Sequence, residues 1–174
     1  MAEQLTDVTI DLATEHDAAD IARVHVSSWR EGYAGILPDT YLASLDVAER
    51  EQRWLENLRN GQRDQVLTWI ARGDGQVVGF SSLGPARDED ADRRAQEIYS
   101  IYLAPDAWGH GVARDLMRTM LEEVAPQAPV TLWVLSDNER ARHFYRRHGF
   151  SADGTERMVE VGAQPYLEVR YRRG

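Results

Sequence analysis

The 174-residue chain contains no cysteine and no lysine. Without cysteine, the chain cannot form a disulfide, a thiolate metal site or a cysteine nucleophile. Without lysine, it cannot form a Schiff-base lysine or a P-loop of the G-x-x-x-x-G-K-[ST] type. All 20 basic side chains are therefore arginines. We interpret this as a bias of composition and not as a sign of function.

Long apolar runs and an excess of positive charge are also missing. No stretch approaches the roughly 20 apolar residues that cross a bilayer, and the start MAEQLTDVTIDL lacks the basic and apolar regions of a secretory signal. Acidic residues outnumber basic ones by 29 to 20, a net charge of −9. This charge argues against nucleic acid as the main partner and is compatible with cationic small molecules, although ordinary solubility is the simpler explanation of it. We expect a soluble cytoplasmic protein, without membrane association, that forms a single domain over 1–174.

Histidine, the remaining common metal ligand, is too scattered to form a site. The five histidines lie at 16, 25, 110, 143 and 148, with no H-x-x-x-H pair. We therefore expect no metal cofactor.

Helical patterns dominate the first third of the chain. A short strand over 7–14 precedes Thr14 and Asp17, whose spacing is that of a capping box. A helix is expected from there to about Trp29, and a second, short one after Pro38 and Asp39. The third is expected over 46–61, ending at Asn60-Gly61.

The pattern then changes to a strand period. Two β-rich runs, 65–72 and 76–83, are joined by Gly73-Asp74-Gly75, which predicts a hairpin. After a polar loop (84–96), the expected elements are a strand over 97–105, a helix over 112–124, a strand over 128–136, a helix over 137–150 with Gly149 as its C-terminal cap, and closing strands over 156–162 and 165–173.

The strand–helix–strand unit in the middle of the chain decides the fold class. It predicts two parallel neighbouring strands joined by a right-handed crossover. Because an antiparallel hairpin precedes it, we predict an α/β fold with a mixed, twisted sheet. Ligands of such sheets bind at the carboxyl ends of the parallel strands.

At that end of the first parallel strand the sequence reads Gly109-His110-Gly111, immediately before a helix. Glycines allow a sharp turn, and a helix N-terminus offers unpaired N–H groups, so the pattern predicts an anion site, most often for a phosphate. A dinucleotide fingerprint G-x-G-x-x-G is one alternative, but Arg114 occupies the place of its third glycine. NAD is therefore the weaker reading.

Two segments, IYLAPDAWGHGVARDLM and VLSDNERARHFYRRHGF, resemble the GNAT superfamily of N-acetyltransferases. The family's pyrophosphate motif is [QR]-x-x-G-x-[GA]; Gly111 and Ala113 fit it, and Trp108 replaces the Gln or Arg. The family's second element, Asn followed by A-x-x-F-Y-x-x-x-G-F, matches Asn138 and 141–150. The resemblance implies a largely antiparallel sheet whose two central parallel strands splay apart for CoA, with helices on both faces.

The same resemblance implies the reaction. An acetyl group would pass from acetyl-CoA to the primary amine of a small-molecule or peptide acceptor, by direct attack in a ternary complex. The absence of cysteine agrees, because no acyl-cysteine intermediate can form. A CoA-binding sensor without catalysis on the same fold is the alternative. The resemblance is also compatible with a homodimer, although no interface pattern decides it.

Site residues follow from the matched positions. Backbone pairing with the pantetheine arm would come from Ile101, Tyr102 and Leu103. The pyrophosphate would lie on Trp108, Gly109, His110, Gly111, Val112, Ala113 and Arg114, where Arg114 is either a charged contact or a solvated helix residue. Asn138 would hydrogen-bond the pantetheine, unless it belongs only to the first turn of its helix.

The resemblance makes Tyr145 the general acid that protonates the departing thiolate, against the alternative of a core aromatic beside Phe144. Because Asn138 and Tyr145 are seven residues apart, they share one helix face. Glu97 would act as the base through water, unless it is a surface glutamate. Trp29 and Tyr33, in an aromatic-rich stretch, would line the acceptor pocket or pack between helices.

Overall fold

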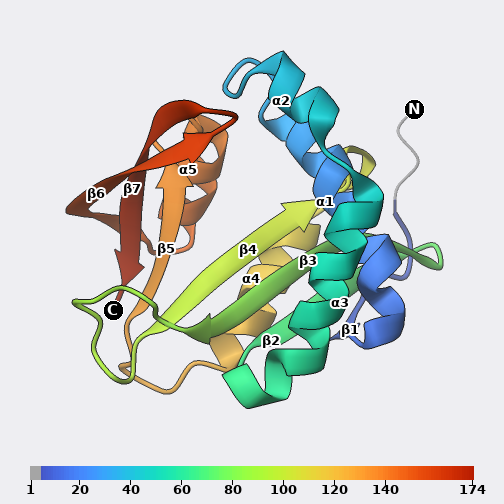
Figure 1. Ribbon diagram of the computed structural model, residues 1–174. Helices are drawn as coiled ribbons and strands as arrows, with labels where there is room; N and C mark the ends of the chain where they lie inside the picture. Colours follow the sequence, from blue (N-terminus) through green and yellow to red (C-terminus); the bar gives the residue numbers. More distant parts are fainter. Residues whose placement is uncertain (1–4) are drawn as a thin grey trace.

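The computed structural model describes residues 5–174 (Figure 1). Within this part, seven strands form one sheet in the order β1-β2-β3-β4-β5-β7-β6. The strands are β1 (Thr9–Leu12), β2 (Leu67–Gly73), β3 (Gln76–Pro85), β4 (Gln96–Leu103), β5 (Val130–Leu135), β6 (Ser151–Val161) and β7 (Gln164–Arg173). Only β4 and β5 pair in parallel among these strands. The predicted mixed, largely antiparallel sheet is confirmed.

Helices cover both faces of the sheet (Figure 1). They are α1 (Ala18–Gly32), α2 (Asp39–Ser44), α3 (Val47–Asp64), α4 (Val112–Glu122) and α5 (Glu139–Arg147), with short 3₁₀ turns at Glu15–Asp17 and Pro105–Ala107. Trp69 and Ala71 of β2 pack in the same cluster as α4, whereas Ile70 between them packs with α1 and α3. Alternate residues of one strand therefore anchor helices on opposite faces.

Local signals in the sequence fix several element ends. The Thr14 backbone N–H donates a hydrogen bond of 2.8 Å to Asp17 Oδ2, as the capping box predicts. Asp74 (φ 51°) and Gly75 (φ 79°) both have positive φ, which matches the twist of a two-residue hairpin turn. Gly149, predicted as the cap of α5, has φ 86°.

Several element boundaries differ from the prediction, and two of these differences have a clear cause. Helix α3 continues past Asn60-Gly61 to Asp64 and ends at Gln65, which is left-handed at φ 58°. Gly61 is needed for close packing, because a Cβ there would lie 3.0 Å from the Val66 carbonyl oxygen. Strand β6 begins at Ser151, five residues earlier than predicted, because a register shift between Ala152 and Glu156 absorbs the polar, glycine-containing segment.

The separation of β4 from β5 is the feature that makes room for a ligand. Their ladder, within residues 5–174, consists of Gln96 opposite Val130 and Glu97 opposite Thr131. Beyond these pairs the strands diverge (Figure 1). The edge of β4 from Ile98 to Leu103 that faces β5 is therefore without a partner strand in the described chain.

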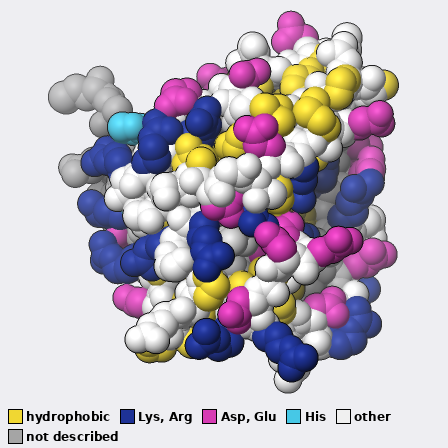
Figure 2. Space-filling model, turned by 90° about the vertical axis from the view of Figure 1, so that its left-hand side faces the viewer, with side chains coloured by type: hydrophobic (Ala, Val, Ile, Leu, Met, Phe, Trp, Pro, Cys, Tyr) yellow, Lys and Arg dark blue, Asp and Glu magenta, His cyan; other side chains and the backbone are white. Residues whose placement is uncertain are grey.

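On the face shown in Figure 2, several basic side chains lie close together along the left-hand edge, whereas acidic and basic side chains are interspersed over the rest. In the part of the chain that the model describes, no helix combines the length and the apolarity that a membrane crossing requires.

Candidate active site

A cavity of about 890 Å³ lies where β4 and β5 diverge. This volume is in the range of small-molecule and cofactor sites. The cavity brings together nearly all of the residues that the sequence singled out: Trp29, Tyr33, Glu97, Ile101, Tyr102, Leu103, Trp108, Gly109, Gly111, Val112, Ala113, Arg114, Asn138 and Tyr145. His110 is not among the described residues that line it.

The glycine turn forms one wall of the cavity. Gly109 (φ 83°) and Gly111 (φ 81°) are both left-handed, and Gly111 is the N-terminal cap of α4. A Cβ on Gly111 would also come within 3.0 Å of Arg114 Nη2. The first N–H groups of α4 therefore meet the cavity at a point where only glycine is unstrained, which suits a bound anion.

Trp108, the departure from the family motif, is held on two sides. Its Nε1 donates to the Leu103 carbonyl oxygen at 3.2 Å. The Arg140 guanidinium of α5 lies over its ring, 3.7 Å from the centre. Arg140, His143 and Arg147 of α5 all line the cavity, so this helix brings basic side chains to a protein of net charge −9.

Asn138 begins α5. Its Oδ1 accepts a hydrogen bond of 3.2 Å from the Ala141 N–H, so the side chain caps the helix. Its amide NH₂ group has no hydrogen-bond partner within residues 5–174. That group remains able to donate to a ligand in the cavity.

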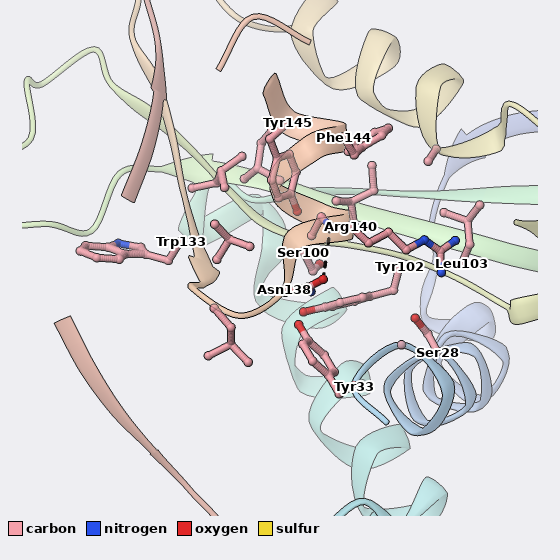
Figure 3. A pocket seen from close by; sticks show the side chains of 18 of the residues that line it. Ser28, Tyr33, Ser100, Tyr102, Leu103, Trp133, Asn138, Arg140, Phe144 and Tyr145 are labelled. Carbon is pink, nitrogen blue, oxygen red and sulfur yellow. Dashed lines mark hydrogen bonds between the residues drawn. The ribbon is translucent and has the colours of Figure 1, made fainter. Parts of the chain in front are cut away.

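Three tyrosines from three elements meet in the cavity: Tyr33 of α1, Tyr102 of β4 and Tyr145 of α5. Figure 3 shows their hydroxyl ends pointing toward one another. Burial, with a smaller effect of Tyr102, raises the pKa of Tyr145 above its ordinary 10.0. Burial also raises the pKa values of Tyr33 and Tyr102. All three phenols therefore keep their protons at neutral pH.

Further aromatic side chains pack behind Tyr102. The His25 ring stacks on Tyr102 with centroids 5.4 Å apart, and Trp54 Nε1 donates to His25 Nδ1 at 3.1 Å. Burial, and secondly Arg50, lowers the pKa of His25 to about 4, so the ring is neutral at pH 7. Trp29 packs edge-on against both Tyr33 and Tyr102. Trp29 therefore both lines the cavity and packs against its neighbours, and its place in an acceptor pocket stays a prediction.

Two carboxylates line the cavity, and their surroundings differ. Glu97 accepts 3.0 Å and 2.5 Å hydrogen bonds from the backbone N–H and Nη2 of Arg87, one on each oxygen, and its side chain is 3% exposed. Glu168 of β7 accepts on Oε2 a 2.7 Å bond from Arg157 Nε, and its side chain is 18% exposed. Its Oε1 has no hydrogen-bond partner in the described chain.

The family model for the acetyltransferase (GNAT) family matches residues 23–150. The chain belongs to the GNAT acetyltransferase family. It is an N-acetyltransferase, and membership of this family supports acetyl-CoA as its cosubstrate.

Relatives and solved structures agree with this assignment. The chain is 34% identical over 134 residues to YuaI, an uncharacterized N-acetyltransferase of Bacillus subtilis, covering 75% of this chain and 73% of YuaI. It is 25% identical over 173 residues to the L-amino acid N-acetyltransferase AaaT of Escherichia coli, covering 96% and 97%. The fold is similar to that of the PaiA N-acetyltransferase of Thermoplasma acidophilum in complex with coenzyme A, with TM-score 0.73, 20% identity and coverage of 97% and 99%.

Several cavity residues of this GNAT protein escaped the sequence analysis. Tyr102 was singled out for its backbone, yet its side chain reaches the other two phenols. The sequence around Arg140 looks like that of an exposed helix. Only the contact of Arg140 with the Trp108 ring shows that it belongs to the cavity. Glu168 and Arg157 alternate with apolar residues on the closing strands, a pattern that usually indicates a solvated face. Among residues 5–174, no group of three or more acidic or histidine side chains is placed to hold a metal ion.

Proposed function

We propose that this protein transfers the acetyl group of acetyl-CoA to the primary amine of a small molecule by direct attack in a ternary complex. One observation carries the proposal: a single cavity joins an anion-binding glycine turn to a cluster of protonated phenols. The turn suits the phosphates of CoA, and the phenols suit the proton transfer that follows thioester cleavage.

In this proposal the CoA lies along β4. The N–H groups from Gly109 to Arg114 receive the pyrophosphate, and Arg140 adds positive charge beside it. The pantetheine arm takes the place of the missing neighbour strand along Ile98–Leu103 and accepts a hydrogen bond from Asn138. The thioester then comes to rest near Tyr145.

The reaction needs one proton donor and one acceptor. The neutral amine attacks the thioester carbonyl carbon, the C–S bond breaks, and Tyr145 gives its proton to the departing thiolate. The tyrosinate is re-protonated by the proton that the nitrogen loses as the amide forms. Glu97 stays a prediction for the base, although both of its carboxylate oxygens already accept hydrogen bonds from Arg87.

A small acceptor fits the walls of the cavity better than an extended peptide. Trp29, Tyr33 and Leu37 pack in one cluster with Val159 and Val161 of β6, and together they close this end of the cavity. These walls leave a bounded pocket for the amine. Amino acids, the acceptors in the name of the AaaT relative, are one candidate class, alongside polyamines and antibiotic amines.

The test is calorimetric titration with acetyl-CoA, CoA and NAD, followed by thiol release in a panel of amines. The proposal expects binding of acetyl-CoA without NAD, and thiol release that depends on an amine. Acetyl-CoA binding without turnover of any amine would favour the sensor alternative. NAD binding without CoA binding would overturn the proposal.

A further inference from the structure

We infer that Glu168 receives the ammonium group of the acceptor and takes its proton, so that the acceptors are cationic amines on a compact apolar or aromatic body. The inference rests on the proposed function and assigns a residue that neither the motifs nor the comparisons mark. Four observations carry it: the place of Glu168 in the sheet, its free oxygen, the aromatic walls around it and its contrast with Glu97.

The sheet register puts Glu168 beside the acetyl site. On one side it is opposite Leu135, the last residue of β5, and on the other it is opposite Arg157 of β6. The Leu135 carbonyl accepts a 3.0 Å bond from the Asn138 N–H, so the chain turns directly from this point into α5, which carries Tyr145. Glu168 therefore stands at the open end of β5, across the gap from β4.

The hydrogen bonds of Glu168 leave half of its carboxylate available. Arg157 Nε holds Oε2 at 2.7 Å, while the same guanidinium stacks 4.1 Å from the centre of the Trp133 ring. Both contacts fix Arg157, and through it the orientation of Glu168. Oε1 has no partner within residues 5–174. By contrast, both oxygens of Glu97 bind Arg87, and that side chain is almost completely buried.

The surroundings of Glu168 suit an ammonium ion attached to an apolar body. Ring faces attract cations, and Tyr33 and Tyr102 both line the same cavity. The charge of Glu168 acts on both rings, since it adds to the effect of burial in raising the pKa values of Tyr33 and Tyr102. Leu135, Val159 and Val161 supply the apolar remainder of the wall.

The proposed step balances. The acceptor binds as R–NH₃⁺, and one N–H bond breaks as its proton passes to the Glu168 carboxylate. The freed electron pair forms the C–N bond to the thioester carbon, and the C–S bond then breaks. Tyr145 protonates the sulfur, and the second proton of the nitrogen restores the tyrosine. Glu168 returns its proton to solvent, so one proton is released for each acetyl group transferred.

The test compares two acceptors of similar shape in the Glu168→Gln variant. Benzylamine is an ammonium ion at neutral pH, whereas O-benzylhydroxylamine is already neutral. We expect kcat/KM for benzylamine to fall by about 100-fold, the usual size of a lost general base. The value for O-benzylhydroxylamine should change far less, because that acceptor is already neutral and needs no deprotonation before it attacks. A role in folding alone would reduce both values equally.

Controls separate the possible outcomes. Glu160→Gln removes an exposed charge from the neighbouring strand β6, outside the cavity lining, and should leave both acceptors unaffected. Glu168→Asp should recover part of the benzylamine activity. Equal losses for both acceptors, no loss for either, or the selective loss in Glu97→Gln instead, would overturn the inference while the proposed function stands. Failure of the unsubstituted protein to acetylate any amine would overturn both.

Discussion

The Arg140 guanidinium lies 3.7 Å from the centre of the Trp108 ring, so helix α5 and the glycine turn are joined across the cavity. The position that carries Gln or Arg in the family motif thus has an aromatic ring here, and the cation above it comes from a different element. A positive charge therefore still lies beside the predicted pyrophosphate site, although Trp108, the side chain at the motif position, is uncharged.

Replacing Arg140 with Gln should weaken CoA binding. Loss of a charge-assisted phosphate contact and of its ring partner should raise the Kd for acetyl-CoA about tenfold, equivalent to about 1.4 kcal/mol. Calorimetry at low and high salt checks this, since the difference between the two proteins should shrink as salt screens the charge. Arg118→Gln, an exposed arginine of α4 outside the cavity lining, is the matched control. An unchanged Kd would place the phosphates elsewhere.

Tyr145→Phe should separate catalysis from binding. Loss of the phenolic proton donor should lower kcat by about 100-fold, while the Kd for acetyl-CoA stays within a few-fold. Steady-state kinetics and calorimetry on the same preparation measure the two quantities. Tyr166→Phe removes a hydroxyl that bonds Gln164 outside the cavity lining and should change neither. Loss of CoA binding in step with turnover would contradict the acid role of Tyr145.

The buried His25 should make stability depend on pH. Its pKa is about 4 in the fold, below the 6.5 of a free histidine, so the unfolded chain takes up the proton first. The free energy of unfolding should therefore fall as the pH drops from 6.5 toward 4, by up to roughly 3 kcal/mol. Urea denaturation at several pH values measures this dependence.

The variant His25→Gln isolates this effect, because Gln keeps an acceptor for Trp54 Nε1 but does not titrate. Its free energy of unfolding should change less than that of the unsubstituted protein over the same pH range. Parallel curves for the two proteins would mean that His25 takes up its proton in the folded state as readily as in the unfolded chain.

Arg170 should be among the strongest single contributors to stability. Its side chain is 8% exposed and bonds Asp88, Asp90 and Asp153, which ties the 86–95 loop to β7. Arg170→Met leaves these carboxylates without their cation and should lower the free energy of unfolding by about 3–5 kcal/mol. Denaturant unfolding measures it, with Arg172→Met, an exposed neighbour on the same strand, as control. A loss no larger than that of the control would show that solvent replaces the network.

The local sequence predicts the elements well because caps, hairpin turns and strand–helix alternation are short-range signals. The capping box at Thr14 and the hairpin at Asp74-Gly75 both form as predicted. The prediction that Gly61 ends the helix is wrong. Glycine is required there by the close contact with the Val66 carbonyl and not by a turn at Gly61 itself. A glycine needed for close approach resembles one that ends a helix until the packing is known.

The candidate site also contains residues that local motifs predict and residues that only the fold brings in. The glycine turn and the Asn138–Tyr145 helix are motifs of consecutive residues, and residues of both line one cavity. Glu168, Arg157 and Arg140 belong to it only because β7 and β6 extend the sheet beyond β5 and α5 follows β5. No local pattern distinguishes such residues from a solvated face, and the predicted roles of the site residues stay predictions.

The short ladder between β4 and β5 has a mechanical consequence. In the described chain the two parts of the sheet, β1-β2-β3-β4 and β5-β7-β6, share backbone bonds only around Gln96–Val130 and Glu97–Thr131. They are therefore joined at one end of the gap and separate at the other. A pantetheine arm lying along β4 would pair with its free edge as a strand does and would hold the two parts of the sheet together. The β4 amide hydrogens that face the gap beyond Glu97 would then exchange slowly in the loaded protein and rapidly in the empty one, whereas those that bond β3 would be protected in both.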